Sequence, residues 1–241
     1  MNNSNEIKIL ESVSREYLEP DDGRMVDKKV ISMVIDNITP WLKGPEILEM
    51  GFGDDLWTSR IIDKYGHSSI VDASQILLNE AKKKYGTKIK AYHCLFEEFI
   101  PDKKYDTVVA SFVLEHVKDP VEILINTKKW INKEGHVIII VPNADSLHRR
   151  LAVCIGLQKR TDELSSTDMR VGHRRVYNIA KMVSDINLAG LKVFRKRGLF
   201  LKFLPQNMMT QLSDELLVGF MKLSENIPME YCSRMIFDCV L

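Results

Sequence analysis

Short apolar runs alternate with amphipathic segments along most of this chain, and this alternation constrains the fold more than any other feature. Five apolar runs have the composition of buried strands: residues 47–50, 69–72, 89–93, 106–110 and 136–141. Helical spacing of apolar residues marks the segments between or before them: 24–38, 57–65, 75–85 and 121–131. Strands that alternate with helices predict an α/β fold, a Rossmann-like doubly wound sheet with helices on both faces.

The second half of the chain completes this sheet. A helix over 178–189 ends at Gly190, and strands are expected over 191–195 and 235–241, which makes a mostly parallel sheet of seven strands. A length of 241 residues suits a single domain, 1–241. We divide it into a helical N-terminal cap (1–40), a cofactor-binding core (41–143), an insert or lid after the fifth strand (144–177) and a C-terminal helix with strands (178–241).

Composition excludes several classes of function. A formal net charge of +1 disfavours nucleic acid and an acidic membrane surface as partners. The four cysteines show no CxxC pair and no metal-ligand spacing with histidines, so no metal site and no disulfide framework is predicted. The chain shows neither the pattern of a signal peptide nor an apolar run long enough for a membrane helix, so we expect a cytoplasmic protein.

A glycine turn follows the first strand. Gly51 and Gly53 stand between a buried strand and a helix, where backbone amides can approach a ligand closely. Asp72 ends the next strand and is placed to accept hydrogen bonds from a ribose diol. Two residues disfavour NAD as the cofactor and an oxidoreductase as the class of enzyme. Glu49 lies in the strand, and Leu56 stands where a dinucleotide fingerprint needs its third glycine.

Five motifs together resemble the class I S-adenosylmethionine-dependent methyltransferases, including the ubiquinone-type O-methyltransferases. The first reads Glu49-Met50-Gly51-Phe52-Gly53-Asp54-Asp55, with Asp55 at the third glycine position of the family. The others occupy residues 71–74, 105–109, 114–120 and 135–143, in the order and at the spacing of the family. The resemblance implies S-adenosylmethionine as cofactor.

The resemblance also implies roles for individual residues. Gly51 and Gly53 would line the methionine part of the cofactor, Glu49 would face its amino group or the turn, and Asp72 would hold the ribose. The full set implied to bind the cofactor is Glu49, Gly51, Gly53, Asp72, Ala73, Leu95, Phe96, Glu97, Ser111, Tyr17 and Arg24. Leu95 and Phe96 would flank the adenine, with Glu97 in place of the acid that members often carry at Cys94. The alternatives are a turn that needs glycine for its shape alone and an Asp72 that caps the following helix.

Three histidines are candidates for a general base. His116 follows the fourth strand, and His148 and His173 lie in the insert after the fifth, at the edge where ligands of parallel sheets bind. Histidine can accept a proton from a hydroxyl acceptor at neutral pH. The alternatives are a loop-capping role for His116 and solvated loop positions for the other two.

The insert is also rich in arginine. Arg149, Arg150, Arg174 and Arg175, with Tyr177, are candidate acceptor-binding residues, since guanidinium groups bind phosphate or carboxylate through paired hydrogen bonds. The segment resembles the Pro-Asn-Ala and Gly-His-x-Arg-x-Tyr stretch of bacterial methyltransferases that act on small molecules. The alternative is that these arginines only increase solubility, with their charge balanced by acidic residues of the insert.

The sequence therefore predicts methyl transfer to a small, anionic acceptor, as O-methylation of a sugar, nucleotide sugar, glycan precursor or natural-product intermediate. The alternatives are an N-methyltransferase acting on an amine or amino sugar and a catalytically silent, cofactor-binding partner subunit. Ser111-Phe112-Val113-Leu114 stands where methyltransferases of nucleic-acid bases carry an Asn/Asp-Pro-Pro-aromatic element, which disfavours that class. The apolar side chains of 199–230 favour a core role over a pocket or a homodimer contact.

Overall fold

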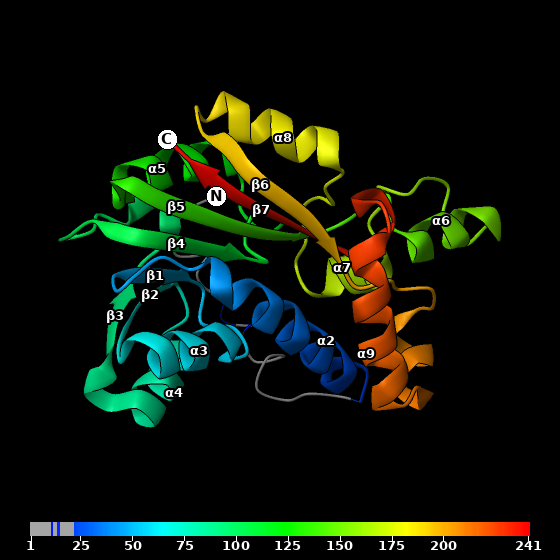
Figure 1. The fold of residues 1–241 in the computed structure, drawn as a ribbon, viewed down its shortest axis with the longest axis horizontal. Coiled ribbons are helices and arrows are strands. Elements are labelled where there is room, and N and C mark those ends of the chain that lie inside the picture. The colour runs from blue at the N-terminus through cyan, green and yellow to red at the C-terminus, as the bar shows by residue number, and fades with distance from the viewer. Residues whose placement is uncertain (1–10, 12–13, 15–21) are drawn as a thin grey trace.

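The computed structural model describes residues 11, 14 and 22–241 and contains one sheet of seven strands in the order β3-β2-β1-β4-β5-β7-β6 (Figure 1). The strands are β1 (Ile47–Met50), β2 (Ser68–Asp72), β3 (Ile89–His93), β4 (Tyr105–Ser111), β5 (Ile131–Pro142), β6 (Lys192–Leu199) and β7 (Arg234–Val240). All neighbours among β1 to β5 pair in parallel, and β7 runs antiparallel to β5 and β6. The predicted Rossmann-like, mostly parallel sheet is confirmed.

The strand order reverses beside β1, which has β2 on one side and β4 on the other. Loops that leave the carboxyl ends of β1 and β4 therefore depart toward opposite faces and leave a crevice between them, the usual ligand site of an open α/β sheet. The glycine turn follows β1, and the segment that carries Glu115 and His116 follows β4. The topology thus brings both groups of predicted site residues to one edge.

Helices cover both faces of the sheet, with α5 and α8 on one side and α2, α3 and α4 on the other (Figure 1). The α-helices are α2 (Asp22–Ile38), α3 (Leu56–Tyr65), α4 (Gln75–Tyr85), α5 (Pro120–Trp130), α6 (Leu147–Cys154), α7 (Ser166–Arg170), α8 (Ile179–Leu188) and α9 (Asp214–Leu223). Short 3₁₀ turns occupy Thr39–Trp41, Gly86–Lys88, Phe96–Glu98, Gln206–Gln211, Ser224–Asn226 and Met229–Tyr231.

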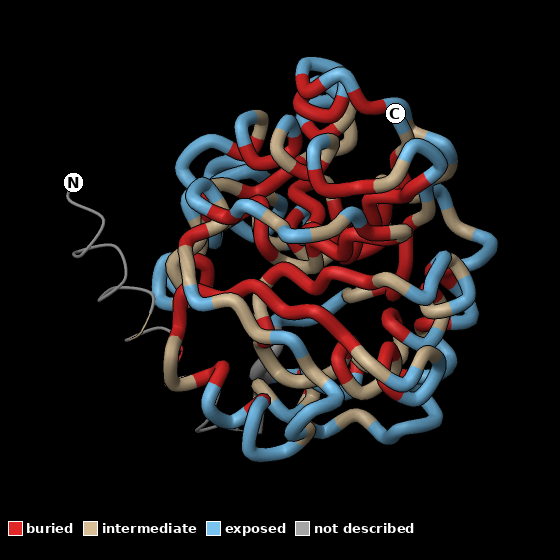
Figure 2. Tube along the Cα trace, turned by 90° about the vertical axis from the view of Figure 1, so that its left-hand side faces the viewer, coloured by how far each residue is buried: buried red, intermediate tan, exposed pale blue. Residues whose placement is uncertain are grey.

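The central strands are buried on both faces, as Figure 2 shows for the strands that cross the middle of the molecule. Val108 and Ala110 of β4 pack with α5 and α8, whereas Val109 between them packs with α2 and α3. Successive side chains of a strand point to opposite faces, so a doubly covered strand must be apolar throughout. This explains why these strands read as continuous apolar runs.

Several elements differ from the sequence prediction. Helices α6 and α7 lie in the insert, where no helix was expected. The strand expected over 136–141 begins at Ile131. The sequence analysis missed this start because residues 132–134 are polar and break the apolar run. The strand expected over 191–195 extends to Leu199. Helix α9 was not predicted, since its apolar residues are spread over buried and exposed faces and blur the helical period.

The region 199–230 contributes to the core, as expected. Phe200, Met209, Leu217 and Met221 are buried and pack in one cluster with α2. Phe203 remains exposed near α9. Among the described residues, no helix is long and apolar enough to cross a membrane.

A buried charged cluster joins β5, β6 and β7 away from the site. His136 is 3% exposed and Asp238 is fully buried, and Nδ1 of His136 lies 2.6 Å from Oδ1 of Asp238. The other carboxylate oxygen accepts a hydrogen bond from Nε of Arg195 at 2.7 Å, and that guanidinium stacks on Trp41 at 4.0 Å from the ring centroid. One carboxylate therefore ties the last strand to both neighbours.

We expect Asp238→Ala to lower the free energy of unfolding by about 3 kcal/mol or more, because removal of one partner leaves buried polar groups uncompensated. Asp214→Ala is the matched control, since the Lys29–Asp214 pair is exposed and should contribute less than about 1 kcal/mol. Urea unfolding followed by circular dichroism measures both values. Equal losses in the two variants would contradict the structural role of Asp238.

Candidate functional site

A cavity of about 1310 Å³ opens at the carboxyl edge of the sheet. Its lining comes from the turns that follow β1, β2 and β4, from the start of α2 and from the insert that holds α6 and α7. Both the predicted cofactor residues and the predicted histidines border this one space. A ligand bound at the glycine turn would therefore share the cavity with the histidines.

The glycine turn has the backbone that the motif predicts. Gly51 has φ 78° and Gly53 has φ 52°, in the left-handed region that glycine adopts without steric cost. Asp55, at the third glycine position, also adopts a left-handed conformation with φ 67°, one that aspartate tolerates better than most residues. A side chain on Gly53 would meet no atom within 4 Å, so the turn presents bare backbone to the cavity.

Asp72 is held by backbone amides at the end of β2. Its Oδ2 accepts from the amide of Phe52 at 2.8 Å, and its Oδ1 accepts from the amide of Ser74 at 2.7 Å. Burial raises the pKa of Asp72, and these two hydrogen bonds oppose the shift. Ser74, rather than Asp72, caps α4 by accepting from the amide of Leu77. The carboxylate is thus oriented at the cavity wall with lone pairs left for hydroxyl donors.

Glu49 lies buried on β1 beside the turn and accepts a hydrogen bond from the hydroxyl of Thr58. Burial raises its pKa well above the usual range, and the nearby carboxylates of Asp55 and Asp72 raise it further. None of the main causes of this shift is a basic group among the described residues. The turn is therefore a site of negative potential that a cationic ligand group would relieve.

The other residues implied to bind the cofactor border the same cavity. These are Ala73, Leu95, Phe96, Glu97, Ser111 and Arg24. Arg24 of α2 reaches Asp54 of the turn at 3.4 Å, so the helix lies against the cofactor side of the cavity. Tyr17 lies outside the described residues.

The three candidate histidines all line the cavity, and each has a partner for Nδ1. Nδ1 of His116 lies 3.3 Å from the carbonyl oxygen of Gly172, and Nδ1 of His173 lies 3.0 Å from Oδ1 of Asp168. Nδ1 of His148 lies 3.1 Å from the hydroxyl of Ser146. The rings of His116 and His173 meet edge to face with centroids 4.8 Å apart.

Burial sets the protonation of this group. It lowers the pKa of His116 to about 4, with a further contribution from the charge of His173, and it lowers the pKa of His148 well below the usual range. Burial acts to raise the pKa of Asp168, but the hydrogen bond from His173 and the charge of Arg149 outweigh it and hold that pKa well below its usual range. His116 and His148 are therefore neutral at pH 7, and Asp168 is ionised.

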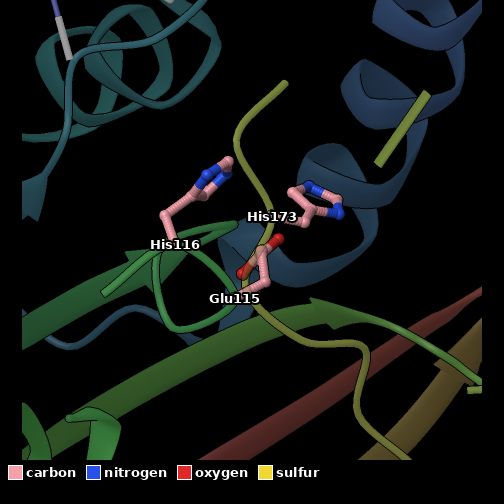
Figure 3. Close-up of side chains that lie close together, drawn as sticks. All are labelled: Glu115, His116 and His173. Atoms are coloured by element: carbon pink, nitrogen blue, oxygen red, sulfur yellow. The ribbon is translucent and has the colours of Figure 1, made fainter. Parts of the chain in front are cut away.

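Two further cavity residues were missed by the sequence analysis. Glu115 is fully buried, burial raises its pKa to about 7, and neither carboxylate oxygen has a hydrogen-bond partner among the described residues. Figure 3 shows it beside His116 and His173. Lys202 also lines the cavity, and burial lowers its pKa to about 8. The position of Glu115 next to His116 could have identified it as a site residue. Nothing in the sequence around Lys202 identifies that residue.

Four of the five predicted acceptor-binding residues make contacts outside the cavity lining. Arg175 donates to the carbonyl oxygens of residues 114, 117 and 118, Arg174 to that of His116, and Arg150 to that of Asp145. The hydroxyl of Tyr177 donates to buried Asp185. These four residues do not line the cavity, because loop carbonyls and a carboxylate bind them elsewhere.

Arg149 does line the cavity. It pairs with Asp168 at 2.6 Å and donates to the carbonyl oxygens of Thr161 and Glu163, so it also braces the insert.

Comparison with known proteins gives a consistent assignment. A family model described as "Methyltransferase domain" matches residues 26–196, more than half of the chain. The ubiquinone biosynthesis O-methyltransferase of Rickettsia conorii is 27% identical over 128 residues, which cover 52% of this chain and 44% of the relative. The protein of the same name from Rickettsia bellii is 26% identical over 152 residues, which cover 58% and 63%. The match thus spans less than two thirds of the length of these relatives.

Among solved structures, the magnesium protoporphyrin IX methyltransferase of Synechocystis, with bound S-adenosylhomocysteine, superimposes with a TM-score of 0.60 at 15% identity. The superposition covers 91% of this chain and 85% of that one. At this identity the likeness speaks for the fold, which agrees with the family match. With its family match, its sheet order and its glycine turn, the chain belongs to the class I S-adenosylmethionine-dependent methyltransferases.

Proposed function

We propose that this protein transfers a methyl group from S-adenosylmethionine to an oxygen of a small acceptor that carries an anionic group. The observation that carries the proposal is the single cavity that joins the glycine turn and Asp72 to the histidines. The O-methyltransferase names of its relatives support oxygen as the acceptor atom.

The cofactor side of the cavity fits S-adenosylmethionine. When bound, this cofactor supplies a methyl group activated by a sulfonium. Glu49 and its acidic neighbours would favour the positive charges of the ligand, and Asp72 would accept hydrogen bonds from the ribose. Leu95, Phe96 and Glu97 would border the adenine.

The acceptor side carries basic groups. Lys202, Arg149 and Arg234 line it, and each contributes to the lowered pKa of His148. Asp27 and Asp168 offset part of this charge, through ion pairs of 2.6 Å with Arg234 and Arg149. A net basic wall suits a carboxylate or phosphate on the acceptor, which includes the sugar, nucleotide-sugar, glycan-precursor and natural-product classes.

Proton removal from an acceptor hydroxyl falls to the histidines. His116 and His148 are neutral, and His173 is oriented by Asp168, so each can present a ring nitrogen to the cavity. A positioned base contributes roughly 10²–10⁴-fold to such a reaction. Alignment of the two reactants in one cavity contributes more, up to about 7–11 kcal/mol.

Calorimetric titration with S-adenosylmethionine and S-adenosylhomocysteine, with NAD as control, tests the cofactor assignment first. Binding of S-adenosylmethionine and S-adenosylhomocysteine, but not of NAD, supports the cofactor assignment. If the protein binds neither S-adenosylmethionine nor S-adenosylhomocysteine, the proposed function is refuted. A panel of hydroxylated acceptors with and without carboxylate or phosphate, followed by mass spectrometry of a gain of one methyl group, then identifies the acceptor.

We expect Asp72→Ala to weaken binding of S-adenosylhomocysteine by at least about tenfold, or about 1.4 kcal/mol, because the ribose loses its acceptor. Calorimetry measures this change. Asp119→Ala is the control, since Asp119 caps α5 and does not line the cavity. Unchanged affinity in Asp72→Ala would remove the ribose role from this residue.

We expect Glu49→Gln to stabilise the cofactor-free protein at pH 7 and to weaken cofactor binding. Because burial raises the pKa of Glu49, the folded state binds more protons than the unfolded state above the usual pKa of 4.5. Stability of the wild type therefore falls as pH rises through that window, and the amide removes the loss. Thermal unfolding at pH 4 and pH 7 measures the effect, which should appear at pH 7 and vanish at pH 4. A variant less stable than wild type at pH 7 would contradict the assignment.

We expect at least one of the variants His116→Ala, His148→Ala and His173→Ala to lower kcat by roughly 10²-fold or more with little change in cofactor affinity, since a lost base slows chemistry rather than binding. His67→Ala is the control, because His67 does not line the cavity. Initial rates with the identified acceptor measure kcat. Near-wild-type turnover in all three variants would exclude a histidine base.

A further inference from the structure

We propose that Glu115, His116 and His173 form a binding site for a divalent transition-metal ion of the Zn²⁺ type, open toward the acceptor side of the cavity. One ligand atom from each residue lies within 4.8 Å of the others. Two imidazoles and a carboxylate that leave coordination positions open are a recurrent metal-binding set. Glu115 and His116 come from the segment after β4, and His173 comes from the loop after α7 (Figure 3).

The hydrogen bonds of the two histidines determine which nitrogen can bind a metal. The partner of Nδ1 is a carbonyl oxygen in His116 and a carboxylate oxygen in His173. Both partners only accept hydrogen bonds, so each Nδ1 carries a proton, and a neutral ring then has its lone pair on Nε2. A ring nitrogen that donates to a carboxylate or carbonyl fixes the orientation of a metal-binding histidine in the same way.

Glu115 supplies an independent observation. Its side chain is fully buried, yet neither carboxylate oxygen has a hydrogen-bond partner among the described residues. An unpartnered buried carboxylate is costly, because burial removes its hydration without compensation. A bound cation at this position would satisfy both oxygens and balance their charge.

The donor set indicates the class of metal. Imidazole suits Zn²⁺, Co²⁺ and Fe²⁺, whereas Mg²⁺ prefers oxygen ligands. Ligand atoms on tetrahedral Zn²⁺ lie about 3.4 Å apart, given metal–ligand distances of about 2.0–2.1 Å. All three side chains face one cavity, and binding of an ion would require them to rotate so that their ligand atoms come closer together.

The role of this ion rests on the proposed function. All three ligands line the cavity, so an open coordination position can bind the acceptor hydroxyl and orient its oxygen for methyl transfer. A divalent ion also lowers the pKa of a bound hydroxyl, whose proton then leaves to a nearby base. With His116 and His173 holding the ion, His148 remains as the histidine of the cavity that can accept this proton.

Titration of the full chain, stripped with EDTA and free of any affinity tag, with Co²⁺ tests the site directly. We expect one Co²⁺ per chain, with the visible absorption of a four- or five-coordinate ion, displaced by Zn²⁺ and not by Mg²⁺. Glu115→Gln keeps the shape of the side chain, and it should weaken Co²⁺ binding roughly 100-fold, as should His173→Ala. His148→Ala, in the same cavity but outside the three ligands, should bind Co²⁺ with wild-type affinity.

Several results would overturn the site. These are no saturable binding to the wild type, binding that survives both Glu115→Gln and His173→Ala, and displacement by Mg²⁺ rather than Zn²⁺. The wild-type absorption spectrum keeps the test decisive even where a variant fails to fold. Because the titration needs neither S-adenosylmethionine nor an acceptor, its failure leaves the proposed methyl transfer standing. Conversely, loss of cofactor binding leaves the metal titration unaffected.

Discussion

The reversal of strand order beside β1 is the constraint on which the rest of this structure depends. It separates the glycine turn after β1 from the Glu115–His116 segment after β4, and the space between them becomes the cavity. Parallel pairing places both strand ends at the same edge, so residues distant in sequence meet without any special interaction between them. The helices cover the two faces of the sheet and leave this crevice open at its edge.

Buried carboxylates give this cavity its chemical character. Glu49 and Glu115 both have raised pKa values because burial removes their hydration, and among the described residues neither accepts a hydrogen bond from a basic side chain. Apolar side chains of similar volume at these two positions would often leave the protein equally or more stable. The presence of these carboxylates on two sides of one cavity therefore indicates ligands that bring positive charge, a sulfonium beside Glu49 and a metal ion beside Glu115.

The insert illustrates how one acidic residue can organise a site. Asp168 pairs with Arg149, orients His173 and completes the capping box of α7 with Ser165. These contacts fold residues 144–177 against the cavity rather than leaving them as an open loop. Arg150 binds a carbonyl oxygen within the insert, whereas Arg175 binds carbonyl oxygens of the segment after β4 and so joins the insert to it.

The sequence by itself determined the sheet, the glycine turn and the position of Asp72, because each depends on local period, backbone conformation or the end of a strand. Even Asp55, at the third glycine position, adopts the left-handed backbone conformation that glycine favours. Only the tertiary structure decided which arginines face the cavity, that α9 completes the core, and that His173 joins Glu115 and His116. Those outcomes depend on contacts between segments far apart in the chain, and no local pattern encodes such contacts.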